Sequence, residues 1–387
     1  MKNGKGPLKG FRFIEVAGIG PTQLCGMLLA DMGAEIIRVE RINTVDLGVG
    51  MEEKYNLMNR SRRSVAINLK DARGRELLLE LCKQADALFE GFRPGVMERL
   101  GLGPEQCMKQ NAKLVYGRMT GWGQEGPLAQ AAGHDPNYIS IAGALGLIGD
   151  DGNGPTYPLN IIGDFGGGAL YLAMGMLAAL LETTKSGKGQ VVDAAMIDGV
   201  ASLLTYFYSL QEAGEWSRER GKNVLDGGAH FLRPYRTSDD QYIVVGALEA
   251  RFYENLLDTL EIDDSDLRNN QMDKTNWPQF REKLQNIFST KTRDEWLEIF
   301  SDSESCFSPV LSLQEATRHP HALERNSYID VAGITQPAPA PRFSRTPSNI
   351  QSPPAEIGEH TIDCLSDWGI DRTLIDKLLK TEIIMQS

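Results

Sequence analysis

The chain of 387 residues contains few cysteines and few histidines, five of each. No two cysteines form a CxxC pair, and an odd count does not suit a disulfide scaffold. We therefore expect reduced thiols and a cytoplasmic location. The histidines lack the spacing of metal ligands. His319 and His321 flank Pro320 and are predicted to lie in a loop, so no metal site is expected.

The chain also lacks an excess of positive charge. Its formal net charge is −12 at pH 7, which argues against binding to nucleic acid or to a membrane surface, because both need a basic face. No apolar segment of a secretory signal follows the basic first residues, and the last residues are not a peroxisomal address. The long apolar run at 165–181 has no basic flanks, so we predict a core helix and no membrane insertion.

The composition that remains is that of an ordinary globular protein, with 41% hydrophobic and 24% charged residues. The length favours one large and one smaller domain. A polar, glycine-bearing stretch near residues 214–230 is the expected boundary. Beyond it, a hairpin at 231–248 and amphipathic helices at 250–318 predict a smaller α+β domain.

Strand and helix patterns alternate along the first 200 residues. The strands are expected at 11–16, 35–40, 64–69, 86–90, 113–119 and 190–195. This alternation predicts an α/β large domain with a Rossmann-like parallel sheet that helices cover on both faces. A turn with Gly18 and Gly20 follows the first strand, but Gln23 occupies the third glycine position of the dinucleotide motif. We therefore do not expect NAD or FAD.

Four basic residues follow strands two, three and four, namely Arg41, Lys70, Arg93 and Arg99. Ligands of parallel sheets bind at the carboxyl ends of the strands, so these residues could form a phosphate cradle. They could equally be ordinary surface charges. The residues alone leave both interpretations open.

The stretch 133–168 carries the main candidates for chemistry. It contains His134 beside Asp135, and Asp164 followed by Phe165 and three glycines. We hypothesise that His134 and Asp164 are two proton-transferring groups that face one carbon. The glycines would let a substrate oxygen approach backbone N–H groups near a helix N-terminus. The alternative is structural, because such pairs often serve as caps and turns.

Many short motifs then resemble one family in family order. They are VAGIGP, RVER, NLK, GFRPGVMERLGLGP, RMTGWGQEGP, GHDPNYIS, NIIGDFGGG, GKGQVVDAAM and PAPRFSRT, and they span almost the whole chain. The chain resembles the family III CoA-transferase superfamily, and within it the racemases that act on 2-methylacyl-CoA thioesters. The resemblance implies an interlocked homodimer. Its large CoA-binding domain would comprise residues 1–215 and the return segment 330–387, and its small domain residues 225–320.

The resemblance also implies roles for individual residues. His134 and Asp164 match the two acid/base groups, and Glu249 matches the small-domain carboxylate that partners the histidine. From its position alone, Glu249 reads as a helix N-terminal acid. With the basic residues above, the implied CoA-contacting set is Arg41, Ile67, Asn68, Leu69, Lys70, Arg93, Arg99, Gly133, Asp135, Asn137 and Tyr138. No cofactor is expected, because coenzyme A is part of the acyl-CoA substrate.

Two alternatives remain at this point. In the CoA-transferase branch, the aspartate that matches Asp164 is a nucleophile that forms an aspartyl–CoA thioester. Those enzymes generally lack the histidine of GHD, so His134 favours a racemase. A CoA-binding regulatory protein is the non-enzymatic alternative. Pro136 departs from the aliphatic residue that is usual in the family, which removes one N–H donor near the expected enolate site.

Overall fold

The computed structural model describes residues 5–43, 50–150 and 152–387, and the chain divides into two compact units. The first unit comprises Met1–Ala142, Leu159–Leu203 and Glu324–Ser387, and the second comprises Gly143–Pro158 and Leu204–Leu323. The division differs from the expected one at several points. Residues 143–158 group with the second unit, the middle segment of the first unit ends at Leu203, about one helix before residue 215, and the return segment begins at Glu324 instead of residue 330.

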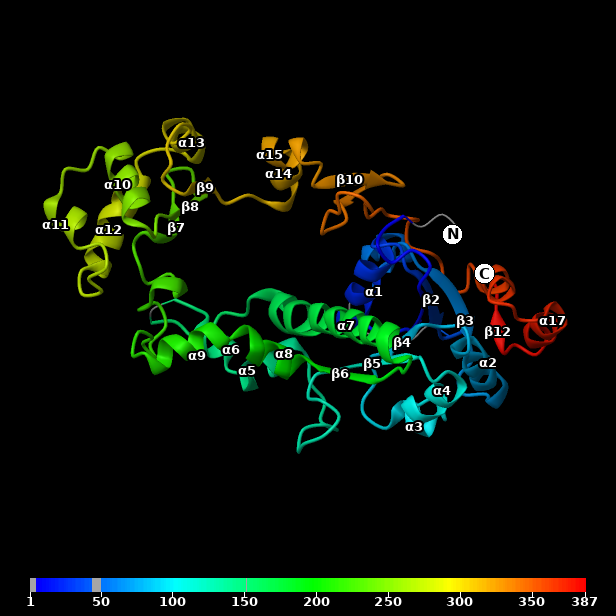
Figure 1. Cartoon of the computed structure of the whole chain (residues 1–387). Helices are drawn as coiled ribbons and strands as arrows, with labels where there is room; N and C mark the ends of the chain where they lie inside the picture. Colours follow the sequence, from blue (N-terminus) through cyan, green and yellow to red (C-terminus); the bar gives the residue numbers. More distant parts are fainter. Residues whose placement is uncertain (1–4, 44–49, 151) are drawn as a thin grey trace. The chain divides into compact units, whose positions relative to one another are not determined.

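A seven-stranded sheet forms the centre of the first unit, with the strand order β12-β3-β2-β1-β4-β5-β6 (Figure 1). Its strands are β1 (Arg12–Val16), β2 (Glu35–Glu40), β3 (Arg63–Ile67), β4 (Ala87–Glu90), β5 (Val115–Thr120), β6 (Val191–Ala195) and β12 (Ile384–Met385). The first six pair in parallel, whereas β12 lies antiparallel to β3 at the edge. The predicted α/β class with a large parallel sheet is confirmed.

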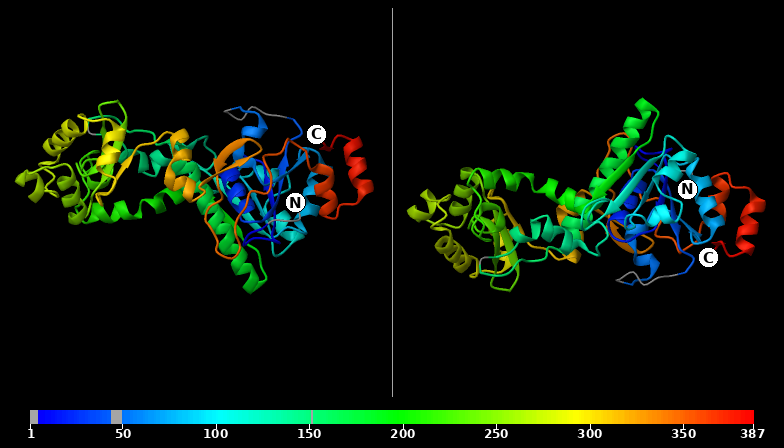
Figure 2. Two further views of the ribbon diagram at one scale, coloured as in Figure 1. Left: turned by 90° about the horizontal axis from the view of Figure 1, so that it is seen from above. Right: turned by 90° about the horizontal axis from the view of Figure 1, so that it is seen from below.

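Alternate residues of the strands supply two separate hydrophobic cores, as expected for a sheet that is covered on both faces. Ile14 belongs to the core with α2 (Ala72–Cys82), α16 (Thr361–Asp367) and α17 (Arg372–Lys380). Its neighbour Phe13 belongs to the core with α1 (Pro21–Asp31) and α7 (Leu170–Ser186). Figure 2 shows the red C-terminal helices and the green α7 on opposite sides of the blue sheet.

The return segment is joined to the start of the chain by buried polar contacts. The Arg60 guanidinium donates to Asp31 Oδ2 at 2.6 Å and to Gln336 Oε1 at 2.8 Å, and all three side chains are buried. Gln336 lies in β11 (Ile334–Pro337), which pairs with β10 (Tyr328–Val331) as an antiparallel hairpin. The residues from Gly333 to Pro354 are rich in Pro, Ser and Arg and predict an extended, PPII-like segment over the surface. Its first residues instead form β11, in which Gln336 is buried.

The second unit has its own sheet and core. Its sheet is β7 (Leu232–Arg236), β8 (Tyr242–Gly246) and β9 (Phe307–Pro309), all antiparallel. Aromatic residues of α10 (Ala250–Thr259), α12 (Trp277–Phe288) and α13 (Arg293–Ile299) fill the core beside it. The remaining helices of four or more residues in this unit are α6 (Ala144–Leu147), α9 (Thr205–Glu212), α11 (Ser265–Asn269), α14 (Leu313–Arg318) and α15 (Pro320–Glu324).

One helical segment of the described chain, Leu159–Ser186, is long and apolar enough to cross a membrane by length and composition alone. Its α7 part packs on the sheet, where Leu172 and Met176 are fully buried against Gly117 of β5. This packing is that of a core helix, as the sequence predicts.

Candidate functional site

Asp164 lies in an unusually wide helical turn. Residues Ile162–Ala169 form a π-helix that runs directly into α7, and the Leu170 N–H donates to the carbonyl of Phe165, five residues earlier. The helix therefore begins before the glycines and not after them. Asp164 is the third residue of this π-helix, and such wide turns occur frequently at functional sites.

The glycines after Asp164 serve helix packing. A Cβ atom on Gly167 would lie 2.7 Å from Val200 Cγ2, and one on Gly199 would lie 1.9 Å from the Gly167 carbonyl oxygen. Both contacts bring the π-helix onto α8 (Met196–Leu203), and Gly167 and Gly168 are buried. The expectation that these two glycines expose backbone to a ligand is wrong, because another helix occupies that space.

The carboxyl group of Asp164 is half-buried and lies among polar neighbours. The Asn160 side-chain amide donates to Asp164 Oδ2 at 3.0 Å. Burial raises the pKa of Asp164, and the Asp135 carboxylate raises it further, whereas the Asn160 hydrogen bond and the His134 side chain lower it. A raised pKa suits a carboxyl group that both takes and returns a proton.

The backbone of His134 is held rigidly in place. Its N–H donates to Asn137 Oδ1 at 3.0 Å, and its carbonyl accepts the N–H groups of Asn137 and Tyr138 at 2.9 and 3.2 Å. These bonds make His134 the N-cap of α5 (Asp135–Ile141), with Pro136 in the first turn, where its missing N–H costs nothing. The imidazole itself is exposed, so it is free to meet a substrate.

Tyr138 fixes the turn that precedes His134. Its hydroxyl donates to the carbonyl of Gly133, and its ring packs edge-on against Trp122 with centroids 4.8 Å apart. The Asp164 carboxylate contributes, after burial, to a raised pKa of Tyr138, and Arg93 opposes it. Arg93 and Asp164 therefore both lie within electrostatic reach of this ring.

Asp135 connects the two stretches. Its Oδ2 accepts the Asp164 backbone N–H at 2.8 Å, which places the turn of His134 beside the turn of Asp164. The same bond occupies the Asp164 N–H. This N–H is therefore not a free donor for a ligand oxygen.

The predicted basic residues lie at the carboxyl edge of the parallel sheet. Arg41 follows β2 directly, Lys70 follows β3 and Arg93 follows β4. These three and Arg99, the last residue of α3 (Val96–Arg99), are all exposed, and among the described residues none of the four forms an ion pair. Exposed cations at this edge are available to a phosphorylated ligand.

The stretch after β3 combines buried and exposed positions. The Ile67 side chain is buried in the sheet, while Asn68 and Leu69 are half-buried. Asn68 Oδ1 accepts the Lys70 N–H at 3.1 Å, which shapes the loop that presents the lysine. A ligand would meet the backbone of this loop and the side chains beyond the strand.

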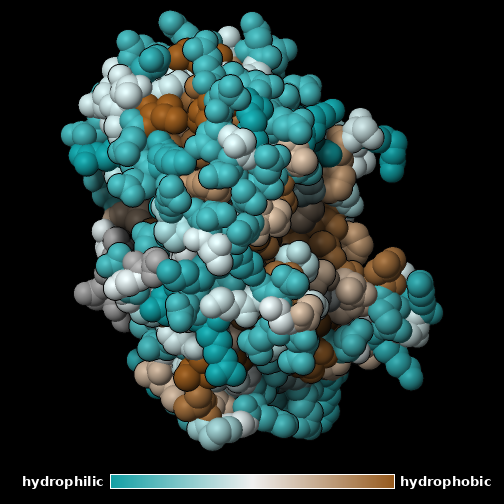
Figure 3. Space-filling model, turned by 90° about the vertical axis from the view of Figure 1, so that its left-hand side faces the viewer, coloured by the Kyte–Doolittle hydropathy of each residue, from teal (hydrophilic) through white to brown (hydrophobic). Residues whose placement is uncertain are grey.

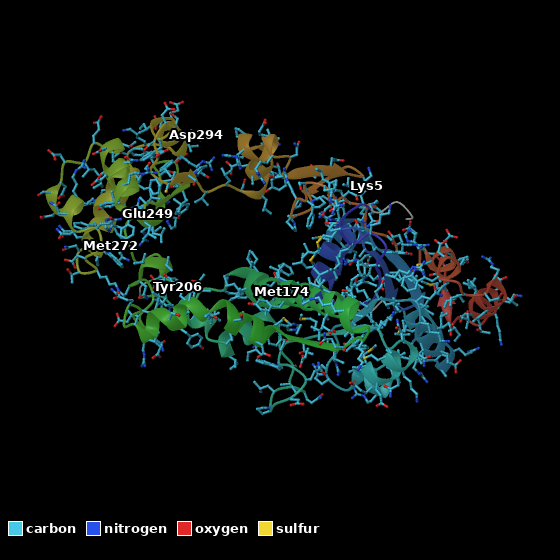
Figure 4. The ribbon with its side chains drawn as sticks, in the orientation of Figure 1. Lys5, Met174, Tyr206, Glu249, Met272 and Asp294 are labelled. Carbon is cyan, nitrogen blue, oxygen red and sulfur yellow. The ribbon has the colours of Figure 1, made fainter. Side chains whose placement is uncertain are left out.

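Glu249 belongs to the second unit, at the N-cap of α10 (Figure 4). Its carboxylate is exposed, and among the described residues it makes no capping hydrogen bond. The interpretation as a helix-capping acid is therefore not supported by a bond. Its negative charge contributes to the raised pKa of the Cys306 thiol, after burial.

Sequence reasoning missed two residues at Asp164. Asn160 lies four positions before Asp164, and residues four positions apart in a helix face each other. We expected the helix to begin after Asp164, so this spacing was not used. Gly20 was considered only as part of a failed nucleotide motif, yet a Cβ atom there would lie 3.2 Å from Asp164 Oδ2. No local pattern links residue 20 to residue 164.

Comparisons with known proteins concern the chain as a whole. The model of the CoA-transferase family III matches residues 8–361. Alpha-methylacyl-CoA racemase of Mus musculus is 41% identical over 380 residues, which cover 97% of each chain. The protein of the same name from Homo sapiens is 40% identical over the same coverage. The crystal structure of a CAIB/BAIF family protein from Brucella suis superposes with a TM-score of 0.82 and 24% identity, over 94% of this chain and all of that one.

Proposed function

We propose that this chain, which belongs to the family III CoA-transferases, is a racemase that interconverts (2R)- and (2S)-2-methylacyl-CoA thioesters. The observation that carries the proposal is the pairing of His134 with Asp164 through the Asp135 bridge, with the pKa of Asp164 raised. The reaction needs no cofactor, because coenzyme A enters as part of the substrate.

The chemistry requires two proton carriers. The α-carbon of a thioester holds a weakly acidic proton, and one residue removes it while the electron pair moves onto the thioester oxygen. The second residue then returns a proton to the opposite face of the enolate, and the carbonyl re-forms. His134 takes the proton from one enantiomer and Asp164 takes it from the other. After one turnover, the residue that acted as base is protonated and the residue that acted as acid is deprotonated, which are the states that the reverse reaction needs.

The enolate oxygen needs a hydrogen-bond donor. The His134 N–H is bonded to Asn137 and the Asp164 N–H to Asp135, and Pro136 has none. The Asp135 N–H, in the first turn of α5, is the donor that we propose. Glu249 of the partner subunit would orient the imidazole of His134.

The coenzyme A moiety would bind along the basic edge of the sheet. Arg41, Lys70 and Arg93 offer charge to its phosphates, and the loop at Asn68 offers backbone groups. Binding energy from this remote part of the substrate holds the α-carbon between the two bases.

A homodimer is the third part of the proposal. The outer face of α7 presents Leu170, Met174 and Leu181, which are 52%, 59% and 62% exposed and repeat at helical spacing (Figure 4 labels Met174). Apolar patches also stand out among hydrophilic side chains on the face in Figure 3. Such surfaces favour a second copy as a partner.

Isotope exchange tests the activity. In deuterium oxide, a pure enantiomer of a 2-methylacyl-CoA should gain one α-deuteron and lose its configuration with wild-type protein. The His134→Ala variant should lose roughly 10²- to 10⁴-fold of the exchange with one enantiomer and less with the other. His321→Ala, which also removes an exposed histidine, is the matched control and should exchange like wild type. Absence of wild-type exchange with every 2-methylacyl-CoA would disprove the racemase.

A second experiment separates the racemase from a CoA-transferase. A transferase would form a mixed anhydride and then a thioester on Asp164, and hydroxylamine would convert that carboxyl group to a hydroxamate. We expect no stoichiometric adduct at Asp164 after incubation with labelled acyl-CoA. A peptide that carries the hydroxamate would instead assign the transferase reaction.

A further inference from the structure

The side chain of Asp135 is placed unusually for a charged group. It is the first residue of α5 and follows His134 directly, yet only 2% of it is exposed. Its carboxylate turns inward, where Oδ2 accepts the Asp164 N–H at 2.8 Å. A buried carboxylate is costly unless hydrogen bonds compensate its charge, so this position demands a specific reason.

Gly163 leaves room for this carboxylate. A Cβ atom on Gly163 would lie 2.4 Å from Asp135 Oδ2, so the π-helix closes around the group only because residue 163 is glycine. The other oxygen, Oδ1, is buried and has no hydrogen-bond partner among the described residues. The negative charge is therefore only partly compensated, and neighbouring groups experience it.

We propose that Asp135 is a positioning residue of the racemase site: its carboxylate fixes the Asp164 backbone relative to His134 and places a negative charge beside the Asp164 carboxyl group. The inference rests on the proposed function and assigns to the side chain a role separate from that of the Asp135 N–H. It gives one residue an effect on both the spacing of the two bases and the basicity of one of them.

The charges around Asp164 support the second half of this role. Burial is the largest cause of the raised pKa of Asp164, and Asp135 raises it further, whereas the Asn160 amide and His134 lower it. Tyr138 is another titratable group close to Asp164. On the side of α1, Asp164 faces Gly20, which adds no charge because it has no side chain. Asp135 thus adds, after burial, to the raised pKa that makes Asp164 a better base than an ordinary aspartate.

Two substitutions separate spacing from charge. Asp135→Asn keeps the acceptor for the Asp164 N–H and the size of the group, and it removes the charge. The pKa of Asp164 should fall, so the acidic limb of kcat/KM should move to lower pH. This shift is expected only with the enantiomer whose proton Asp164 removes.

Asp135→Ala removes the acceptor too, and should reduce kcat roughly 10- to 100-fold with both enantiomers, with little change in KM.

The matched control is Asp363→Asn, which removes an exposed acid from the first turn of α16 and should leave both pH profiles unchanged. Circular dichroism and thermal melting establish that each variant is folded. If Asp135→Ala does not fold, the nearly isosteric Asp135→Asn decides alone. A wild-type acidic limb in Asp135→Asn overturns the inference, while wild-type protein without exchange overturns the proposed function instead.

Discussion

Substitution of Gly20 by alanine should weaken catalysis by pushing Asp164 out of place. Gly20 has φ of 62° and ψ of −112°, a combination that L-residues rarely adopt, and it is the N-cap of α1. The strain should cost about 1–3 kcal/mol of folding stability. The added Cβ would also lie 3.2 Å from Asp164 Oδ2 and 3.6 Å from its Cγ, closer to the oxygen than ordinary contacts of 3.4–4 Å.

The carboxyl group must therefore move by a few tenths of an ångström. A displacement of about 1 Å at a reacting group can cost 10²-fold in rate, so we expect a loss of roughly three- to tenfold in kcat. Deuterium exchange measures it with each enantiomer, and the loss should be larger where Asp164 removes the proton. KM should change little, because the substitution does not alter the basic edge of the sheet where we propose that coenzyme A binds.

Gly101→Ala separates the two effects. Gly101 has a similar positive φ of 70°, but a Cβ there meets nothing within 4 Å. This variant should lose comparable stability in urea denaturation without losing exchange. Equal losses of exchange in both variants would refute the reasoning, because backbone strain alone would then account for the effect at Gly20.

Three further predictions follow from packing and charge. Arg60→Ala should destabilise the fold by about 3–5 kcal/mol in urea denaturation, because it leaves the Asp31 carboxylate buried and unpaired; a loss below about 1 kcal/mol would contradict this. Met174→Glu should dissociate the proposed homodimer in sedimentation velocity, whereas Leu374→Glu, on the exposed side of α17, should leave it intact. Since burial raises the pKa of Asp164, exchange that starts from its carboxylate should fall with decreasing pH at a midpoint above the usual aspartate value of about 3.9; a midpoint at or below that value would contradict the assignment.

The sheet could be predicted from the sequence because its signals are local. The strand EIIRVE was expected at residues 35–40, and β2 has these bounds. An apolar strand that is bounded by turn residues can be recognised from a few consecutive residues. The edge strand β12 was missed because it has only two residues, which carry no period of their own.

The site could be predicted only in part. The sequence singled out His134 and Asp164, and the hydrogen bond from the Asp164 N–H to Asp135 places their turns side by side. The π-helix could not be predicted, because no local pattern marks its wide turn, and the close packing of its Gly167 against α8 joins residues that are distant in the sequence. The contact of Gly20 with Asp164 spans 144 positions of the chain and has no local signal. Such contacts exist only once the sheet brings distant loops to one edge.

The first unit is built from three separate stretches of chain, and this has a consequence for its synthesis. The face of the sheet that carries Ile14 is covered by Trp368, Ile375 and other residues near the end of the chain. On the ribosome, the part of that apolar surface that these C-terminal residues cover stays open while the second unit is translated. A chaperone that binds exposed hydrophobic strands should therefore engage the nascent chain until its last 64 residues, which begin at Glu324, have emerged.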